Sequence, residues 1–290
     1  MTDAQRRLAR ISVAALAALA LGGCDFALLD PQGEIGAQNR ALLVSSTLWM
    51  LVVVIPVIVM AVLFPWWFRA GNREAKYTPD WESEKRLEAV VWGIPLFIVA
   101  FMAVGAWTST HAIDPKRPIV SDEPTLKVEV VALDWKWLFV YPELGIASVN
   151  ELAMPVNAPV EFSVTSDSVM NSFFIPRLGS QIYAMAGMSN RLHLIADKSG
   201  DYPGLPANYS GRGFSGMRFT ARAMPRQAFD AWVAEVRSSG RALDDAGYAA
   251  LAAPSENHPV EHYASVPAGF YENLIAKYRG PAPQHPAMKE

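Results

Sequence analysis

The sequence predicts a membrane-anchored all-β protein, in which a two-helix transmembrane hairpin precedes a β-sandwich or barrel and short C-terminal helices. Of its 290 residues, 51% are hydrophobic and 18% charged, with a mean hydropathy of +0.14, which is too apolar for an ordinary soluble domain. Two segments without internal charge are each long enough to cross a bilayer. Residues 122–224 then alternate apolar and polar side chains with the period of a strand.

The first 23 residues have the layout of a secretory signal peptide. Three arginines between positions 6 and 10 precede an apolar run that is too short for a comfortable membrane span. The single cysteine of the chain, Cys24, follows it. Because the string LGGC resembles a bacterial lipoprotein processing site, we expect residues 1–23 to be removed and Cys24 to carry lipid, the alternative being a lone buried cysteine. Asp25 resembles the residue that retains such lipoproteins in the inner membrane.

The two apolar segments predict a hairpin over residues 24–110. The first, Ala41–Phe68, ends in the Trp66–Trp67 pair, and the second covers residues 88–107. A proline in each span would kink its helix, which is tolerated where a neighbouring helix satisfies the freed carbonyls. The loop between the spans holds the densest cluster of lysines and arginines in the chain. The positive-inside rule therefore places this loop in the cytoplasm, and both termini and the lipidated Cys24 outside.

A compact all-β domain is expected over residues 120–225. Leu126, Val128 and Val130 lie on one face of the first predicted strand, and prolines and glycines interrupt the pattern about every ten residues. Residues 226–290 are predicted to hold two amphipathic helices, RQAFDAWVAEVRSSG and PAGFYENLIAKY, and a loose proline-rich tail. A net charge of −3 without a basic block argues against nucleic acid as a partner.

The order of these parts, together with three strings, resembles subunit II of the haem-copper respiratory oxidases. The strings are LEAVVWGIP before and within the second span, LDWKWLFVYPE at the start of the β-domain, and SDSVMNSFFIPRLG at residues 166–179. The resemblance runs from Cys24 to about Met224. It implies a cupredoxin-like β-sandwich on the periplasmic side of a bacterial inner membrane.

The copper ligands of the family are missing from this chain. Family members that oxidise cytochrome c have a histidine on the third string and a C-x-x-x-C-x-x-x-H-x-x-M loop. Here Asn171 replaces the histidine, and YSGRGFSGM places Tyr209, Gly213 and Met217 at the other vacated positions. No cysteine follows Cys24, and copper centres of this kind need thiolate ligands. The resemblance thus predicts a domain without metal.

Within the family, a subunit II without copper is similar to that of the cytochrome bo-type ubiquinol oxidases. The resemblance then implies haems and copper in subunit I, further subunits III and IV, ubiquinol oxidation through subunit I, and no cofactor or catalytic residue in this chain. The isolated chain would be inactive. Glu88 matches a family glutamate at the mouth of a proton channel; the alternative is an ordinary acid at a helix N-terminus.

Other chemistry-bearing residues receive structural interpretations. Trp135 and Trp137 are two apart and are expected to share a face, in the core or at a subunit interface. HPVEH, residues 258–262, fits a zinc-peptidase pattern, but Pro259 disfavours a helix there and a solvated loop is expected. His193 is predicted to be a structural strand residue. Two functions stay open beside the quinol oxidase: a copper-bearing subunit of cytochrome c oxidase, and a membrane-anchored assembly lipoprotein.

Overall fold

The computed structural model describes residues 26–76, 78, 82 and 84–278, so Cys24, Asp25 and the C-terminal tail lie outside the described residues. A short 3₁₀ helix, η1 (Ala27–Leu29), leads into α2 (Glu34–Trp67), and α3 (Lys85–Ala112) runs back beside it. Both helices are long and apolar enough to cross a membrane. Both helices begin several residues before the expected spans. Helix α2 contains Pro56 and Pro65 and is bent partway along its length.

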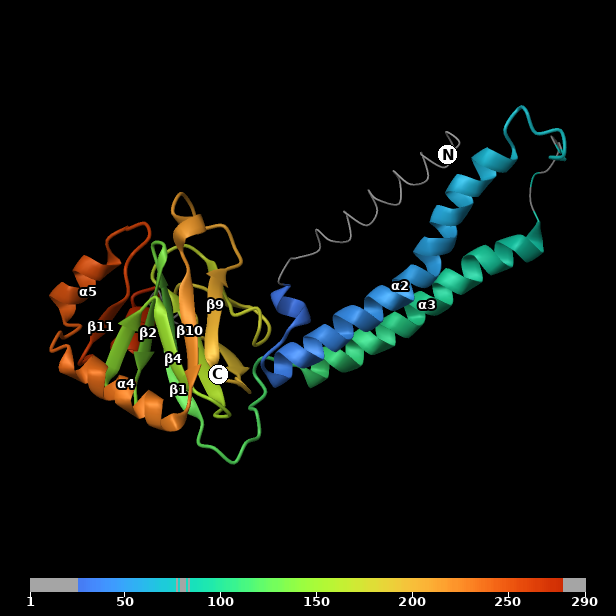
Figure 1. The fold of residues 1–290 in the computed structure, drawn as a ribbon. Coiled ribbons are helices and arrows are strands. Elements are labelled where there is room, and N and C mark those ends of the chain that lie inside the picture. Colours follow the sequence, from blue (N-terminus) through green and yellow to red (C-terminus); the bar gives the residue numbers. More distant parts are fainter. Residues whose placement is uncertain (1–25, 77, 79–81, 83, 279–290) are drawn as a thin grey trace, which may run out of the picture.

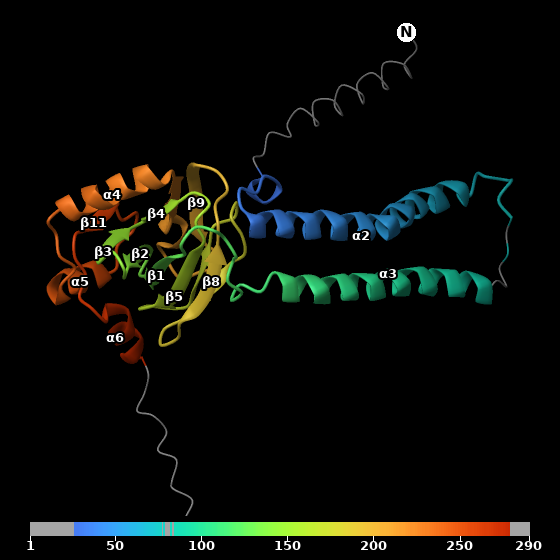
Figure 2. The ribbon, with the colours of Figure 1, turned by 90° about the horizontal axis from the view of Figure 1, so that it is seen from below.

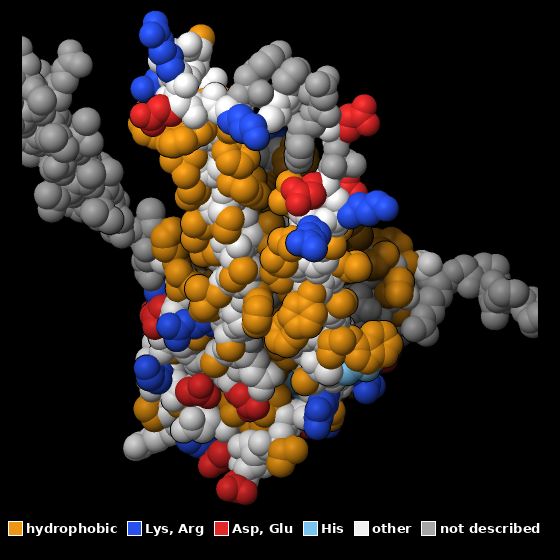
Figure 3. Space-filling view, turned by 90° about the vertical axis from the view of Figure 1, so that its right-hand side faces the viewer, with side chains coloured by type: hydrophobic (Ala, Val, Ile, Leu, Met, Phe, Trp, Pro, Cys, Tyr) orange, Lys and Arg blue, Asp and Glu red, His pale blue; other side chains and the backbone are white. Residues whose placement is uncertain are grey.

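The hairpin carries its apolar side chains outward. Figure 3 shows an almost continuous hydrophobic surface between the charged groups near the loop end and those around the β-domain. Trp49 and Phe101 pack across the hairpin with ring centroids 4.6 Å apart. An apolar surface of this kind is suited to lipid or to other apolar helices rather than to water.

The β-domain is a sandwich of two sheets (Figure 1). The six-stranded sheet has the order β11-β3-β2-β1-β5-β8, and the five-stranded sheet has the order β4-β10-β9-β6-β7. The strands are β1 (Leu126–Leu133), β2 (Lys136–Tyr141), β3 (Ile146–Val149), β4 (Glu151–Pro155), β5 (Val160–Ser166), β6 (Asn171–Phe174), β7 (Ile182–Ala184), β8 (Asn190–Leu194), β9 (Gly200–Pro206), β10 (Phe219–Met224) and β11 (Glu261–Tyr263).

Alternation along the strands builds the core between the sheets. Leu126, Val128 and Val130 are buried in it as the sequence predicts. Phe173 and Phe219 stack with ring centroids 5.2 Å apart, and Trp137 meets both rings edge-on. Buried aromatic rings of this size supply much of the burial energy of such a sandwich.

The C-terminal region packs onto the β-sandwich and adds a strand to its larger sheet. The predicted helices are α4 (Arg226–Ser238) and α6 (Phe270–Ala276), and α5 (Asp245–Ala252) lies between them. A second apolar cluster covers the outer face of the six-stranded sheet with side chains of α5, β11 and α6. Because β11 pairs with β3, the sheet itself is completed by residues beyond the expected boundary.

Candidate functional site

The loop between β9 and β10 holds most of the vacated ligand positions. It is shaped around Trp135, which adopts φ +62° in the β1–β2 turn and donates from Nε1 to the Ser210 carbonyl at 3.0 Å. A Cβ at Gly213 would lie 2.4 Å from the Trp135 ring, and Gly211 has φ +109°. Gly213 is therefore needed because the indole lies directly against the backbone, and Gly211 is needed because of its positive φ.

The four vacated ligand positions do not converge as a donor set. Asn171 and Met217 are buried, whereas Tyr209 is 75% exposed and packs against Phe214. The Ser210 hydroxyl lies 4.0 Å from the Met217 sulfur. The space beside Gly213 is filled by the Trp135 ring. An amide, a phenol and a thioether offer neither thiolate nor imidazole, so these residues do not fit a copper centre.

The two tryptophans have different environments. Trp137 has 0% exposure and lies in the core, which is one of the two placements expected for it. Trp135 is half-buried in a turn, so the two rings do not share a strand face. The backbone of Trp135 leaves the extended conformation, which period-two reasoning could not anticipate.

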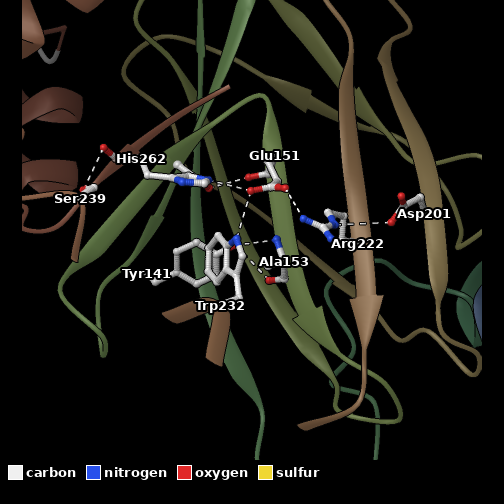
Figure 4. A network of polar contacts seen from close by, with 9 residues as sticks. Tyr141, Glu151, Ala153, Asp201, Arg222, Trp232, Ser239 and His262 are labelled. Carbon is white, nitrogen blue, oxygen red and sulfur yellow. Dashed lines mark hydrogen bonds and ion pairs between the residues drawn. The ribbon is translucent and has the colours of Figure 1, made fainter. Parts of the chain in front are cut away.

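Sequence reasoning missed a buried polar network centred on Glu151 (Figure 4). Its carboxylate accepts from Arg222 at 2.8 Å and from the Trp232 Nε1 at 3.1 Å, and lies 2.7 Å from the His262 Nε2. Burial alone would raise the pKa of Glu151, but these partners together lower it below its usual value. The network joins β4, β10, α4 and β11, so it fastens the C-terminal region to both sheets.

The HPVEH string is divided between two environments. His262 lies in β11 and points to Glu151, whereas the Nε2 of His258 lies 3.5 Å from Glu261. Residues 258–260 form the loop that was expected, whereas Glu261 and His262 belong to the edge strand β11. Within the described part of the chain, no group of three or more histidine, cysteine, aspartate or glutamate residues is placed to hold a metal ion.

Two further buried charges fix the C-terminal helices. Lys136 is fully buried and donates to the carbonyls of Leu251 and Ala253, at 2.8 and 2.7 Å, at the end of α5. Burial lowers the pKa of Lys136. Asp167 accepts from Tyr248 of the same helix at 2.5 Å and from Lys277 at 2.8 Å. Neither role has a local sequence signal, because the partners are about a hundred residues apart.

The two remaining candidate residues, Glu88 and His193, lie on the second long helix and in a buried strand. Glu88 is exposed in the first turn of α3, at the loop end of the hairpin. His193 is buried in β8, as expected for a structural residue, and both its backbone N–H and its Nδ1 lie 3.0 Å from the Pro115 carbonyl.

Comparison with known families agrees with this architecture. The family described as cytochrome c oxidase subunit II, periplasmic domain, matches residues 143–224. The COX aromatic rich motif matches residues 237–282, which include α5, β11 and α6. The chain belongs to the subunit II family of the haem-copper oxidases.

Particular relatives lie within the quinol oxidase branch. The cytochrome bo(3) ubiquinol oxidase subunit 2 of Pseudomonas putida is 51% identical over 275 residues, which cover 95% of this chain and 88% of the relative. The ubiquinol oxidase subunit 2 of Acetobacter aceti is 53% identical over 263 residues, which cover 90% of this chain and 85% of the relative. A crystal structure of the periplasmic domain of cytochrome oxidase subunit II from Bradyrhizobium japonicum is 24% identical, covers 42% of this chain and 99% of that one, and has a TM-score of 0.39.

Proposed function

We propose that this chain is subunit II of a proton-pumping terminal ubiquinol oxidase in a bacterial inner membrane. It acts beside a haem-bearing subunit I and subunits III and IV, and it contributes structure and a proton path without a redox centre of its own. The observation that carries the proposal is the loop of residues 207–217, in which the Trp135 ring fills the space beside Gly213, a residue that the family resemblance implies to be a vacated ligand position. The names of the relatives support the choice of quinol as the electron donor.

The absence of thiolate and imidazole from the loop has a consequence for electron entry. A domain without copper cannot relay electrons from a soluble cytochrome c, so the electrons must reach subunit I from within the membrane. In this assembly the β-domain binds neighbouring subunits, and the isolated chain does not turn over quinol.

Purification of the complex through a tag on this chain tests the proposal. We expect a haem-bearing partner to co-purify, and its reduced-minus-oxidised haem spectrum to develop with ubiquinol but not with reduced cytochrome c as donor. A purple copper absorption or reduction by cytochrome c would assign the chain to the cytochrome c oxidases. Isolation without haem would leave an assembly lipoprotein instead.

Glu88 is the proposed entry point for protons at the cytoplasmic end of α3. A carboxylate at such a boundary can exchange protons with water and pass them to a partner. We expect Glu88→Ala to slow turnover of the whole oxidase at saturating quinol by several-fold. Glu84→Ala, at the N-cap of the same helix, is the matched control and should leave turnover unchanged. Unchanged turnover in Glu88→Ala would remove this residue from the proton path.

Lipidation of Cys24 is the proposed third attachment to the membrane. The mature chain would then begin at Cys24 with acyl groups on the periplasmic side. Mass spectrometry of the purified subunit should show cleavage before Cys24 and added acyl mass, and Cys24→Ser should lack both. An unmodified cysteine in the wild-type chain contradicts this part of the proposal.

A further inference from the structure

A pocket lies where the hairpin meets the β-domain. It has a volume of about 310 Å³, and its lining includes Glu34 and Gln38 from α2 and Asp114, Arg117 and Val120 from the segment after α3. Figures 1 and 2 draw the start of α2 beside the end of α3, next to the β-domain. The pocket therefore opens at the boundary between the membrane-spanning helices and the periplasmic domain.

Both walls of the pocket are attached to the β-domain. On the α2 side, the N–H groups of Gln32 and Gly36 donate to the carbonyls of Arg177 and Leu178, at 2.7 and 3.0 Å. On the other side, the Pro115 carbonyl lies 3.0 Å from both the N–H and the Nδ1 of His193. Because backbone contacts fix both walls, the pocket is preformed and a ligand would not have to order it.

With both helices spanning a bilayer, the pocket would lie at the level of the outer headgroups. The first turn of α2 and the last turn of α3 supply its walls. Trp107 is 70% exposed five residues before the end of α3, the position of an interfacial aromatic residue. Val120 is 98% exposed, and an apolar side chain so fully exposed beside the membrane surface is suited to contact with lipid.

The charges of the pocket have both signs. Arg117 is exposed and, among the described residues, its side chain has no hydrogen bond or ion pair. Two carboxylates share the pocket with it: Glu34, which accepts from Gln38 at 3.1 Å, and Asp114, which accepts from the Lys116 N–H at 2.9 Å. A guanidinium pairs well with a phosphodiester, and carboxylates pair with an ammonium but repel a headgroup of net negative charge.

We propose that this pocket binds the headgroup of a phospholipid that carries a phosphodiester and a primary ammonium, as in phosphatidylethanolamine. Arg117 binds the phosphate, Glu34 and Asp114 receive the ammonium, and the acyl chains lie along the apolar hairpin. The bound lipid would fill the corner between the hairpin and the β-domain.

Native mass spectrometry of the detergent-solubilised oxidase complex tests the proposal, with phosphatidylethanolamine and phosphatidylglycerol of identical acyl chains as probes. We expect phosphatidylethanolamine to bind more tightly to the wild-type complex. Arg117→Gln should weaken its binding by about tenfold, because a charge-assisted contact to phosphate is lost. Lys116→Gln, which removes the neighbouring cation outside the pocket lining, should leave binding unchanged.

A second variant tests the ammonium subsite. Asp114→Asn should reduce the preference for phosphatidylethanolamine over phosphatidylglycerol, because one repelling carboxylate is removed. Equal binding of the two lipids to the wild type, or equal losses in Arg117→Gln and Lys116→Gln, would overturn the proposal. So would loss of a partner subunit from Arg117→Gln with unchanged lipid binding, because a protein would then cover the pocket. Quinol turnover, measured on the same samples, reports separately on the proposed function.

Discussion

Trp135 is the residue that gives the β9–β10 loop its shape. Its indole donates to the Ser210 carbonyl and lies against the backbone of Gly211 and Gly213. A side chain thereby organises the loop through one hydrogen bond and the packing of a ring on the backbone. This arrangement depends on glycine at residue 213, because a Cβ there would lie 2.4 Å from the ring.

Gly213→Ala should therefore disturb the loop. The added Cβ lies 2.4 Å from the Trp135 ring, and overpacking of this kind costs about 1–3 kcal/mol. Hydrogen exchange of the purified complex should show faster exchange over residues 207–217, and its thermal unfolding should occur at lower temperature. Tyr209→Ala, an exposed change on the same loop, is the control and should alter neither; slow exchange retained in Gly213→Ala would show that Trp135 does not shape the loop.

Glu129 predicts a pH dependence of stability. Burial, reinforced by the charge of Glu272, raises the pKa of this β1 carboxyl from 4.5 to about 7. Since the folded-state pKa is raised, its contribution to stability is complete below pH 4.5 and is lost as the pH rises through about 7. Glu129→Gln removes the charge that burial disfavours. Because the group is partly solvated, the variant should raise the free energy of unfolding at pH 8 by only about 1 kcal/mol and should change that free energy little at pH 4.

Chemical unfolding of the complex at these two pH values, followed by exchange or proteolysis of the β-domain, checks the sign. The exposed Glu123→Gln is the matched control, with no expected change at either pH. A gain of stability at pH 4 as large as that at pH 8 would mean that the titration of Glu129 is not the cause.

At the scale of elements, the start of α2 is docked on the β-domain through glycine. A Cβ at Gly33 would lie 2.2 Å from the Ile195 carbonyl oxygen, and one at Gly36 would lie 2.9 Å from that of Arg177. The Asp30 carboxylate pairs with Arg177 at 2.8 Å in the same region. Close approach of two backbones, rather than side-chain packing, forms this joint.

Gly33→Ala should separate the start of α2 from the β-domain. Because the obstructing atom is a backbone oxygen, relief requires movement of the helix start, and the bond from the Asp197 N–H to the Gln32 carbonyl at 2.9 Å should be lost. Faster hydrogen exchange at Asp197 in the intact complex would report this. Gly105→Ala, in α3 with no atom within 4 Å of an added Cβ, is the control, and protection at Asp197 retained in Gly33→Ala would contradict the docking argument.

Local patterns predicted the long elements and not the long-range pairings. Uninterrupted apolar runs sufficed for α2 and α3, and period-two alternation sufficed for β1, β5 and β10. The strand β11 could not be found this way, because its three residues are set by pairing with β3. For the same reason the roles of Glu151, Lys136 and Asp167 have no local signal in the sequence, because their partners lie on elements that only the fold brings together.

At the scale of the whole molecule, the C-terminal region covers a sheet face that the sandwich alone leaves exposed. Val131, Leu133, Leu138 and Val140 are buried against it. A chain ending after Ser238 should expose this face together with the buried Lys136, and we expect it to aggregate or to be degraded rather than to assemble. A chain ending after Tyr278 should accumulate and assemble normally, as judged by the haem content of the purified complex; normal assembly of the shorter chain would show that the region is dispensable.

The position of β11 sets a limit on when the domain can fold. This edge strand of the larger sheet spans Glu261–Tyr263, whereas its partner β3 spans Ile146–Val149. The larger sheet therefore cannot be completed until the residues between these two strands have been synthesised and lie on the same side of the membrane. Until then the apolar outer face of β1–β3 is uncovered, which leaves the unfinished domain open to aggregation.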